Sequence, residues 1–161
     1  MRPSRRLLGL MSAVVASSRS EDPHTKVGCA VENKDGRIVA VAYNGLPPKT
    51  EMPPHFATEE GRAEKRTVFI HAEINALSLV PLGQAHTLYL TISPCKNCCA
   101  SLAANGVKKV IYLEKYHLDD GFAKNLDFYG ILHEEATEQE KELLLPIQET
   151  INLILTKENT K

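Results

Sequence analysis

Hydrophobic residues near the start of the chain recur at the spacing of one face of a helix. These apolar positions are Leu7, Leu8, Met11, Val14 and Val15. The pattern predicts an amphipathic helix over residues 7–16. A basic start, an apolar stretch and small residues after it also resemble a signal peptide, and this alternative stays open. No run of roughly 18 apolar residues occurs in the chain, so the sequence predicts no membrane span.

The next two segments have the pattern of a β-hairpin. "KVGCAVEN" at 26–33 and "RIVAVAYNG" at 37–45 are rich in β-branched residues, and "KDG" at 34–36 separates them. Residues 46–56 contain four prolines, so we expect an irregular loop there.

From residue 57 onward, segments of helical pattern alternate with segments of strand pattern. Helices are expected over 57–66, 71–80, 94–105, 119–130 and about 137–158. Strands are expected over 86–92, 107–113 and 131–136. Pro81 with Gly83 should end the second of these helices, Gly106 the third, and Pro146 should kink or split the last.

The order of these elements predicts an α/β fold. A strand, a helix and a strand in succession form a right-handed crossover, so the last two strands should be parallel. Alternation on this scale predicts a three-layer α-β-α sandwich, with a mixed five-stranded sheet covered by helices on both faces. A chain of 161 residues fits one domain, 1–161, with a helical C-terminal tail at about 137–158.

Composition and charge narrow the class of function. Hydrophobic residues make up 43% of the chain and charged residues 24%, as in a globular protein. The formal net charge is −1, so no overall basic field attracts nucleic acid. A bound phosphate would therefore be held by a few well-placed cations.

Three of the four cysteines lie together in "SPCKNCC", as Cys95, Cys98 and Cys99, whereas Cys29 lies far upstream. Four cysteines are too few for a disulfide scaffold. Their crowding favours metal or redox chemistry in a reducing compartment, and we therefore expect a cytoplasmic protein.

Two short motifs supply the residues of a catalytic metal site. "HAE" at 71–73 and "PCKNC" at 94–98 each open a predicted helix. Zinc favours imidazole and thiolate, and a catalytic site keeps three protein ligands and an open position. His71, Cys95 and Cys98 match that ligand set, and a helix N-terminus stabilises thiolates. Glu73 can approach the metal only if the ion lies off the helix end, because residues i and i+2 are about 200° apart around a helix.

Other readings of the cysteines remain open at this point. A structural zinc knuckle would need a fourth ligand, and neither Cys99 nor Cys29 is an obvious one. A redox pair would follow the first strand and would lack the His-x-Glu motif. Cys99 lies about 100° further around the helix than Cys98 and should be a small buried residue. The alternative is that Cys99 replaces Cys98, since positions i and i+4 also share a helix face.

The joint pattern H-x-E followed by P-C-x-x-C resembles the zinc-dependent cytidine deaminase superfamily. Further segments resemble the deoxycytidylate (dCMP) deaminase family within it, over roughly residues 5–135. These segments are "RSEDPHTKVG" at 19–28, "YNGLP" at 43–47, "HAEINAL" at 71–77, "SPCKNC" at 93–98, "GVKKVIY" at 106–112 and "KYH" at 115–117.

The resemblance implies a cytidine deaminase-like fold, one catalytic Zn²⁺ and hydrolytic loss of ammonia from C4 of a deoxycytidine nucleotide. The substrate would be dCMP, giving dUMP, with dCTP as a second candidate. Glu73 would protonate ring N3 and then the departing amine. The backbone at Ala72 would hold the base, Val27 would pack against the ring, Asn44 would bind a sugar hydroxyl and Tyr116 would stack. The implied phosphate contacts are Arg19, Ser20, Lys26 and Lys115.

Each of these substrate contacts also has an ordinary structural reading, as a turn residue, a core residue or a solvated surface cation. By the same resemblance we expect a homo-oligomer, a hexamer, with dCTP and dTTP as effectors and no nucleic acid or membrane as partner. Residues 46–70 offer only His55 as a metal ligand, so no second zinc is expected.

Other functions remain as alternatives. Within the same chemistry they are deamination of cytidine, guanine or tRNA adenosine, and the charge of −1 argues against tRNA. A catalytically silent zinc-binding or nucleotide-binding module is the alternative from a different class, and the presence of Glu73 argues against it.

Overall fold

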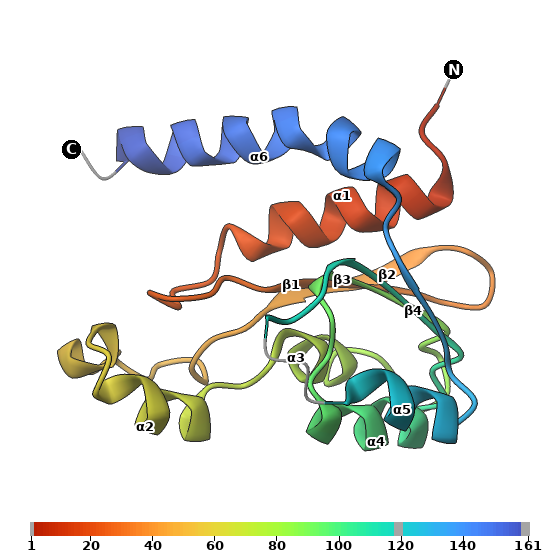
Figure 1. Cartoon of the computed structure of the whole chain (residues 1–161), viewed down its shortest axis with the longest axis horizontal. Helices are drawn as coiled ribbons and strands as arrows, with labels where there is room; N and C mark the ends of the chain where they lie inside the picture. Colours follow the sequence, from red (N-terminus) through yellow and green to blue (C-terminus); the bar gives the residue numbers. More distant parts are fainter. Residues whose placement is uncertain (1, 118–120, 159–161) are drawn as a thin grey trace.

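One mixed β-sheet forms the centre of the computed structural model, which describes residues 2–117 and 121–158 (Figure 1). Within these residues the strands are β1 (Gly28–Glu32), β2 (Ile38–Tyr43), β3 (Thr87–Ile92), β4 (Lys109–Glu114) and β5 (Leu132–Glu135). The α-helices are α1 (Arg5–Ser17), α2 (Gly61–Val68), α3 (Ala72–Leu77), α4 (Lys96–Ala104), α5 (Phe122–Phe128) and α6 (Glu138–Glu158). A short 3₁₀ helix, η1, covers Pro54–Ala57.

The strand order is β2-β1-β3-β4-β5. β1 pairs antiparallel with both β2 and β3, whereas β3, β4 and β5 run parallel. The predicted hairpin, the mixed five-stranded sheet and the parallel pairing of the last two strands are therefore confirmed.

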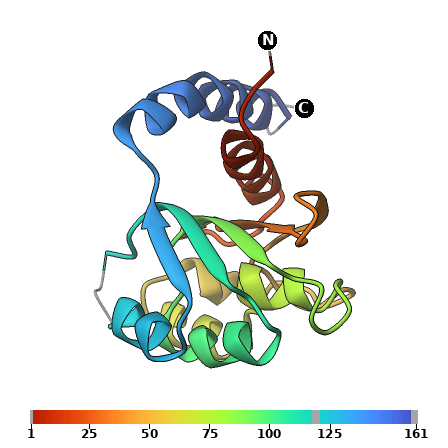
Figure 2. The same ribbon diagram turned by 90° about the vertical axis from the view of Figure 1, so that its right-hand side faces the viewer.

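Alternate residues of β1, β3 and β4 enter two separate hydrophobic clusters, one on each face of the sheet. Val31, Leu90 and Val110 pack on one face with α3, α4 and α5. Ala30 and Tyr89 pack on the other face with α1 and with Leu144 of α6. The predicted three-layer sandwich is confirmed, and α6 lies over α1 on the side away from the sheet (Figure 2).

Helix α1 lies very close to the sheet because two glycines leave room for it. A Cβ atom on Gly28 of β1 would lie 1.9 Å from the carbonyl oxygen of Ala13, and one on Gly9 would lie 2.3 Å from the ring of Tyr89. Both positions require glycine because a side chain there would clash with the opposing element. Neither glycine has a positive φ, so the backbone conformation is not the reason.

Three helices differ from the sequence prediction. α2 covers Gly61–Val68 instead of 57–66, and residues 54–57 form η1. α3 ends at Leu77 instead of reaching 80, because the backbone N–H groups of Leu79 and Val80 donate to residues three positions earlier and so form tighter turns ahead of Pro81. α6 is one continuous helix that Pro146 does not split, because Leu144 and Ile147 pack in the same cluster on either side of the proline. The predicted start of α5 at 119–120 lies outside the described residues. No described helix is long and apolar enough to cross a membrane.

The attachment of α6 can be tested with two leucines of the same helix. Leu144 is fully buried, whereas Leu153 is 55% exposed. We expect Leu144→Ala to lower the free energy of unfolding by about 2–3 kcal/mol, because it leaves a cavity against α1. Leu153→Ala should change it by less than about 0.5 kcal/mol. Urea unfolding followed by circular dichroism measures both, and equal effects would contradict the packing described.

Candidate metal centre and active-site cavity

A cavity of about 340 Å³ opens where α2, the start of α3 and the start of α4 meet one end of the sheet. α3 and α4 contribute the chemically distinctive part of its lining, which includes His71, Glu73 and Cys95. Both helices pack against the same sheet face through apolar residues such as Leu77 and Leu102, so their first residues are held in place together.

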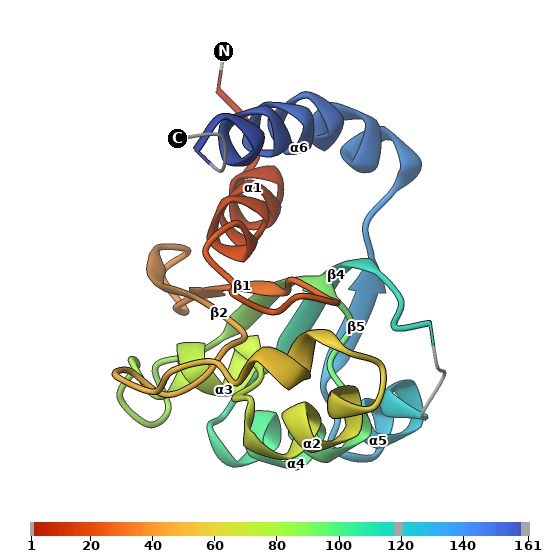
Figure 3. The ribbon, with the colours of Figure 1, turned by 90° about the vertical axis from the view of Figure 1, so that its left-hand side faces the viewer.

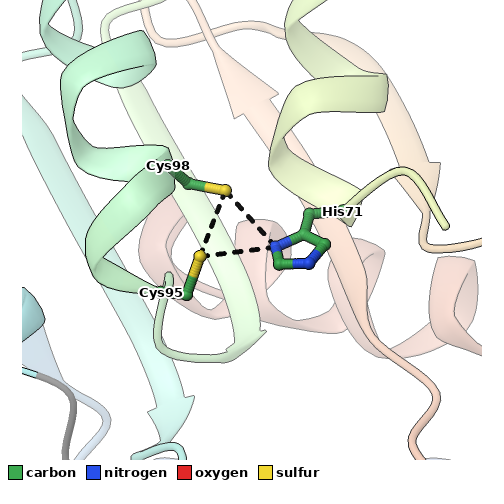
Figure 4. A group of neighbouring side chains, drawn as sticks. All are labelled: His71, Cys95 and Cys98. Atoms are coloured by element: carbon green, nitrogen blue, oxygen red, sulfur yellow. Dashed lines mark hydrogen bonds between the residues drawn. The ribbon is translucent and has the colours of Figure 1, made fainter. Parts of the chain in front are cut away.

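One imidazole and two thiols converge at these helix starts (Figure 4). His71 and Cys95 are the N-cap residues of α3 and α4, and Cys98 lies in the first turn of α4. The Nδ1 atom of His71 lies 3.5 Å from Sγ of Cys95 and 3.3 Å from Sγ of Cys98. The two sulfurs are 3.5 Å apart.

This triangle fits a tetrahedral zinc ion. With bonds of about 2.3 Å to sulfur and about 2.0 Å to nitrogen, tetrahedral angles separate two sulfurs by about 3.8 Å and sulfur from nitrogen by about 3.5 Å. The observed separations are close to both values, and the donor set of one nitrogen and two sulfurs is one that zinc prefers. The three residues would therefore hold one zinc ion at the wall of the cavity, which His71 and Cys95 line.

Cys95 is already biased towards the thiolate form that a metal binds. A hydrogen bond from the Cys98 thiol, with a further contribution from His71, lowers the pKa of Cys95 to about 4. The same hydrogen bond raises the pKa of Cys98, which retains its proton in the absence of a metal. The interaction with Cys95 also raises the pKa of His71 to about 8. A cation would replace these shared protons, since metal binding requires deprotonated ligands.

Glu73 lies beside this group and is almost fully buried. Its Oε1 is 4.0 Å from Nδ1 of His71. The two side chains converge because His71 is an extended N-cap residue, so the 200° separation of helical residues does not apply to it. Burial raises the pKa of Glu73, while the nearby charge of His71 opposes that effect. A carboxyl group in such surroundings is suited to accepting and returning a proton.

The family model for the cytidine and deoxycytidylate deaminase zinc-binding region matches residues 3–114. The chain belongs to this family. The match includes both helix starts that carry the His/Cys/Cys group, and the predicted cofactor, one zinc ion, agrees with the family and with the donor set.

Relatives in this family include a probable deoxycytidylate deaminase of Caenorhabditis elegans, which is 39% identical over 65% of this chain and 55% of that protein. The deoxycytidylate deaminase of Homo sapiens is 30% identical over 67% of this chain and 64% of the human protein. The chain thus matches less than two thirds of the length of either relative.

The fold is similar to that in a crystal structure of dCMP deaminase from cyanophage S-TIM5 in complex with dCMP and dUMP. The TM-score is 0.66 and the sequence identity 30%, over 84% of this chain and 99% of the cyanophage chain. The cytidine deaminase-like fold is confirmed.

The structure gathers about half of the predicted substrate contacts at the cavity. Val27, Asn44, Ala72 and Tyr116 all line it. Cys99 is fully buried and its Sγ points to the carbonyl oxygens of Cys95 and Phe122, away from the ligand triangle.

The four predicted phosphate contacts do not line this cavity. Arg19 and Lys115 are exposed, and Lys115 lies 4.0 Å from Glu135. Ser20 is buried and donates a hydrogen bond to the side chain of Asn44. The ammonium group of Lys26 donates to the carbonyl oxygen of Ser20. Their role with phosphate stays a prediction.

Sequence reasoning missed the cations that do line the cavity. Arg62, Lys65 and Arg66 come from α2, for which the sequence predicted only a helix over 57–66. The available signal was their spacing shortly before "HAE": Lys65 and Arg66 follow Arg62 by three and four residues, so both are its neighbours on the helix surface.

The ligand set can be tested with two neighbouring cysteines. We expect Cys98→Ser to lose most of its zinc after dialysis, because a weak hydroxyl ligand replaces a thiolate. Cys99→Ser should retain about one ion per chain, since Cys99 is outside the triangle. Metal content by atomic emission decides this, and loss of zinc from Cys99→Ser with retention by Cys98→Ser would reverse the assignment.

Proposed function

We propose that the protein is a zinc-dependent hydrolase that deaminates a deoxycytidine nucleotide, converting dCMP to dUMP and ammonia. The observation that carries the proposal is the buried carboxyl group of Glu73 beside a three-ligand metal group that faces a cavity. The names of the relatives support dCMP as the substrate.

His71, Cys95 and Cys98 would hold the zinc ion. When bound, zinc supplies Lewis-acid chemistry that makes a water molecule acidic near neutral pH. Glu73 takes one proton from the attacking water and passes it to ring N3, then takes the proton of the hydroxyl group formed at C4 and delivers it to the departing amine. A C4–O bond forms, the C4–N bond breaks, and ammonia leaves.

The base would lie between Val27 and Tyr116, close to the backbone of Ala72. Ala72 is fully buried at the first position of α3, so its backbone is a fixed hydrogen-bonding group for the ring. The backbone N–H of Tyr116 donates to Oγ of Ser93 at 2.9 Å, which holds the segment after β4 at the rim of the cavity.

Arg62 and Arg66 are the best-placed cations for the phosphate. They lie one turn apart on α2 and both line the cavity, unlike Arg19, Lys26 and Lys115. Guanidinium groups suit phosphate because they donate two parallel hydrogen bonds.

Several finer points belong to the same proposal. dCTP is a second candidate substrate, and the family resemblance suggests regulation by dCTP and dTTP in a hexamer. A cytoplasmic location fits a site built on two thiols, since a reducing compartment preserves them.

The reaction is tested by incubating zinc-loaded protein with dCMP, dCTP, deoxycytidine and cytidine and measuring released ammonia. We expect the highest kcat/KM with dCMP. Glu73→Gln should keep its zinc and lose about 10²- to 10⁴-fold in kcat, because the amide cannot carry the proton. No turnover of any of the four by zinc-loaded wild type would refute the enzyme, and normal turnover by Glu73→Gln would refute the role of Glu73.

The phosphate contact is tested with Arg66→Met. We expect KM for dCMP to rise roughly ten- to a hundredfold, because a charge-assisted hydrogen bond is lost. KM for deoxycytidine, which has no phosphate, should change little. Lys34→Met is the control, since it removes an exposed cation in the turn between β1 and β2, outside the cavity. Equal effects of the two substitutions on dCMP would contradict the assignment.

A further inference from the structure

Helix α2 is attached to the rest of the protein in an unusual way. Its sequence, GRAEKRTV, offers no apolar face, and its buried residues are Gly61 and Lys65. Figure 1 shows α2 at the left-hand end of the helical layer, and Figure 3, viewed from that end, shows it in front of the other helices and below the sheet. The one long side chain by which α2 reaches the interior is therefore a lysine.

The ammonium group of Lys65 forms an ion pair with the carboxylate of Asp22, from the loop between α1 and β1. Their side chains are 5% and 6% exposed, and both residues line the cavity. Nζ of Lys65 also lies 5.2 Å from the ring centroid of Phe69. A buried pair of this kind depends on further hydrogen bonds to satisfy its remaining polar atoms.

Asp22 has those hydrogen bonds. Its Oδ1 accepts from the backbone N–H groups of His24 at 2.8 Å and Thr25 at 3.0 Å, and its Oδ2 accepts from Nδ2 of Asn44 at 3.1 Å. Burial alone would raise the pKa of Asp22, but Lys65 and the two amides hold it below its usual value. Asp22 is therefore the ionised centre that joins α2 to Asn44.

The amide of Asn44 is fully occupied in turn. Nδ2 donates to Asp22 and, at 2.9 Å, to the carbonyl oxygen of Thr25. Oδ1 accepts from the backbone N–H of Val27 at 2.8 Å and from Oγ of Ser20 at 2.7 Å. All four hydrogen-bonding positions of the amide are used, so its orientation is fixed. The wall of the cavity that contains Asn44 and Val27 is thus linked to Lys65 through Asp22.

We propose that Lys65 is a positioning residue, which through its buried ion pair with Asp22 holds α2 and its two arginines against the wall formed by Asn44 and Val27. The inference rests on the proposed function for the role of Arg62 and Arg66 as phosphate contacts. Lys65 itself acts through Asp22 and through the placement of its helix.

Two variants separate the role of Lys65 in positioning α2 from its contribution to the stability of the protein. Lys65→Met alone leaves the carboxylate of Asp22 buried without its partner, which is strongly destabilising. Asp22→Asn with Lys65→Met removes both charges, and the amide oxygen introduced by Asp22→Asn can still accept hydrogen bonds from the N–H groups of His24 and Thr25. Its NH₂ group replaces the oxygen that accepts from Nδ2 of Asn44, so that one hydrogen bond is lost. Part of the lost stability should therefore return in the double variant, whereas the ionic link to α2 does not.

The experiment uses the zinc-loaded full chain as wild type, Lys65→Met and the double variant. Calorimetry gives the affinity for dUMP and deoxyuridine, thermal unfolding gives Tm, and hydrogen exchange reports on residues 61–68. We expect Tm to fall in Lys65→Met and to recover in part in the double variant. Both variants should bind dUMP about tenfold more weakly, because one charge-assisted phosphate contact is lost. Their affinity for deoxyuridine should change little, and hydrogen exchange in residues 61–68 should be faster than in wild type.

The control is Glu64→Gln, which removes an exposed ion pair between α2 and His55 and should change none of these quantities. Wild-type affinity for dUMP in the double variant, or unchanged exchange in 61–68, would overturn the proposal, because Lys65 would then contribute stability alone. If wild type binds no nucleotide but the exchange of 61–68 still rises in both variants, the proposed function fails and the attachment of α2 by Lys65 is supported.

Discussion

The meeting of two helix starts at one end of the sheet is the constraint on which the rest of the structure depends. α3 and α4 follow different strands, yet both pack on the same sheet face through apolar residues such as Ala76 and Leu102. Their N-cap residues, His71 and Cys95, are therefore brought within 3.5 Å of each other. Without this packing, three potential ligands from two distant segments could not share one ion.

The two sides of the cavity are held together by different forces. The side that carries the metal ligands and Glu73 is fixed by hydrophobic packing, which is dense and non-directional. The side that carries Arg62 and Arg66 is joined through one buried ion pair, which demands a defined geometry and loses its value when either partner is missing. The structure thus separates the site of bond breaking from the site proposed to hold the phosphate.

Most of the fold could be predicted because its elements have regular patterns. β3 and β4 are continuous apolar runs, and α1 repeats its apolar positions at helical spacing. The predicted helices differ from the structure where the local sequence pattern and the tertiary packing indicate different boundaries. α3 ends before residue 80 because its last residues form tighter turns ahead of Pro81, and α6 is not split at Pro146 because residues on both sides of it pack together.

The sequence by itself determined the chemistry, because His71, Glu73, Cys95 and Cys98 stand in short motifs whose spacing restricts what they can bind. Only the tertiary structure decided which polar side chains support that chemistry. Lys65 and Asp22 are 43 residues apart, and no motif in the sequence indicates that they pair. The family resemblance implies a phosphate contact for Ser20, and only the structure shows that this side chain is buried and bonded to Asn44. The physical reason is that burial and pairing of a charge depend on distant segments meeting, which local spacing does not encode.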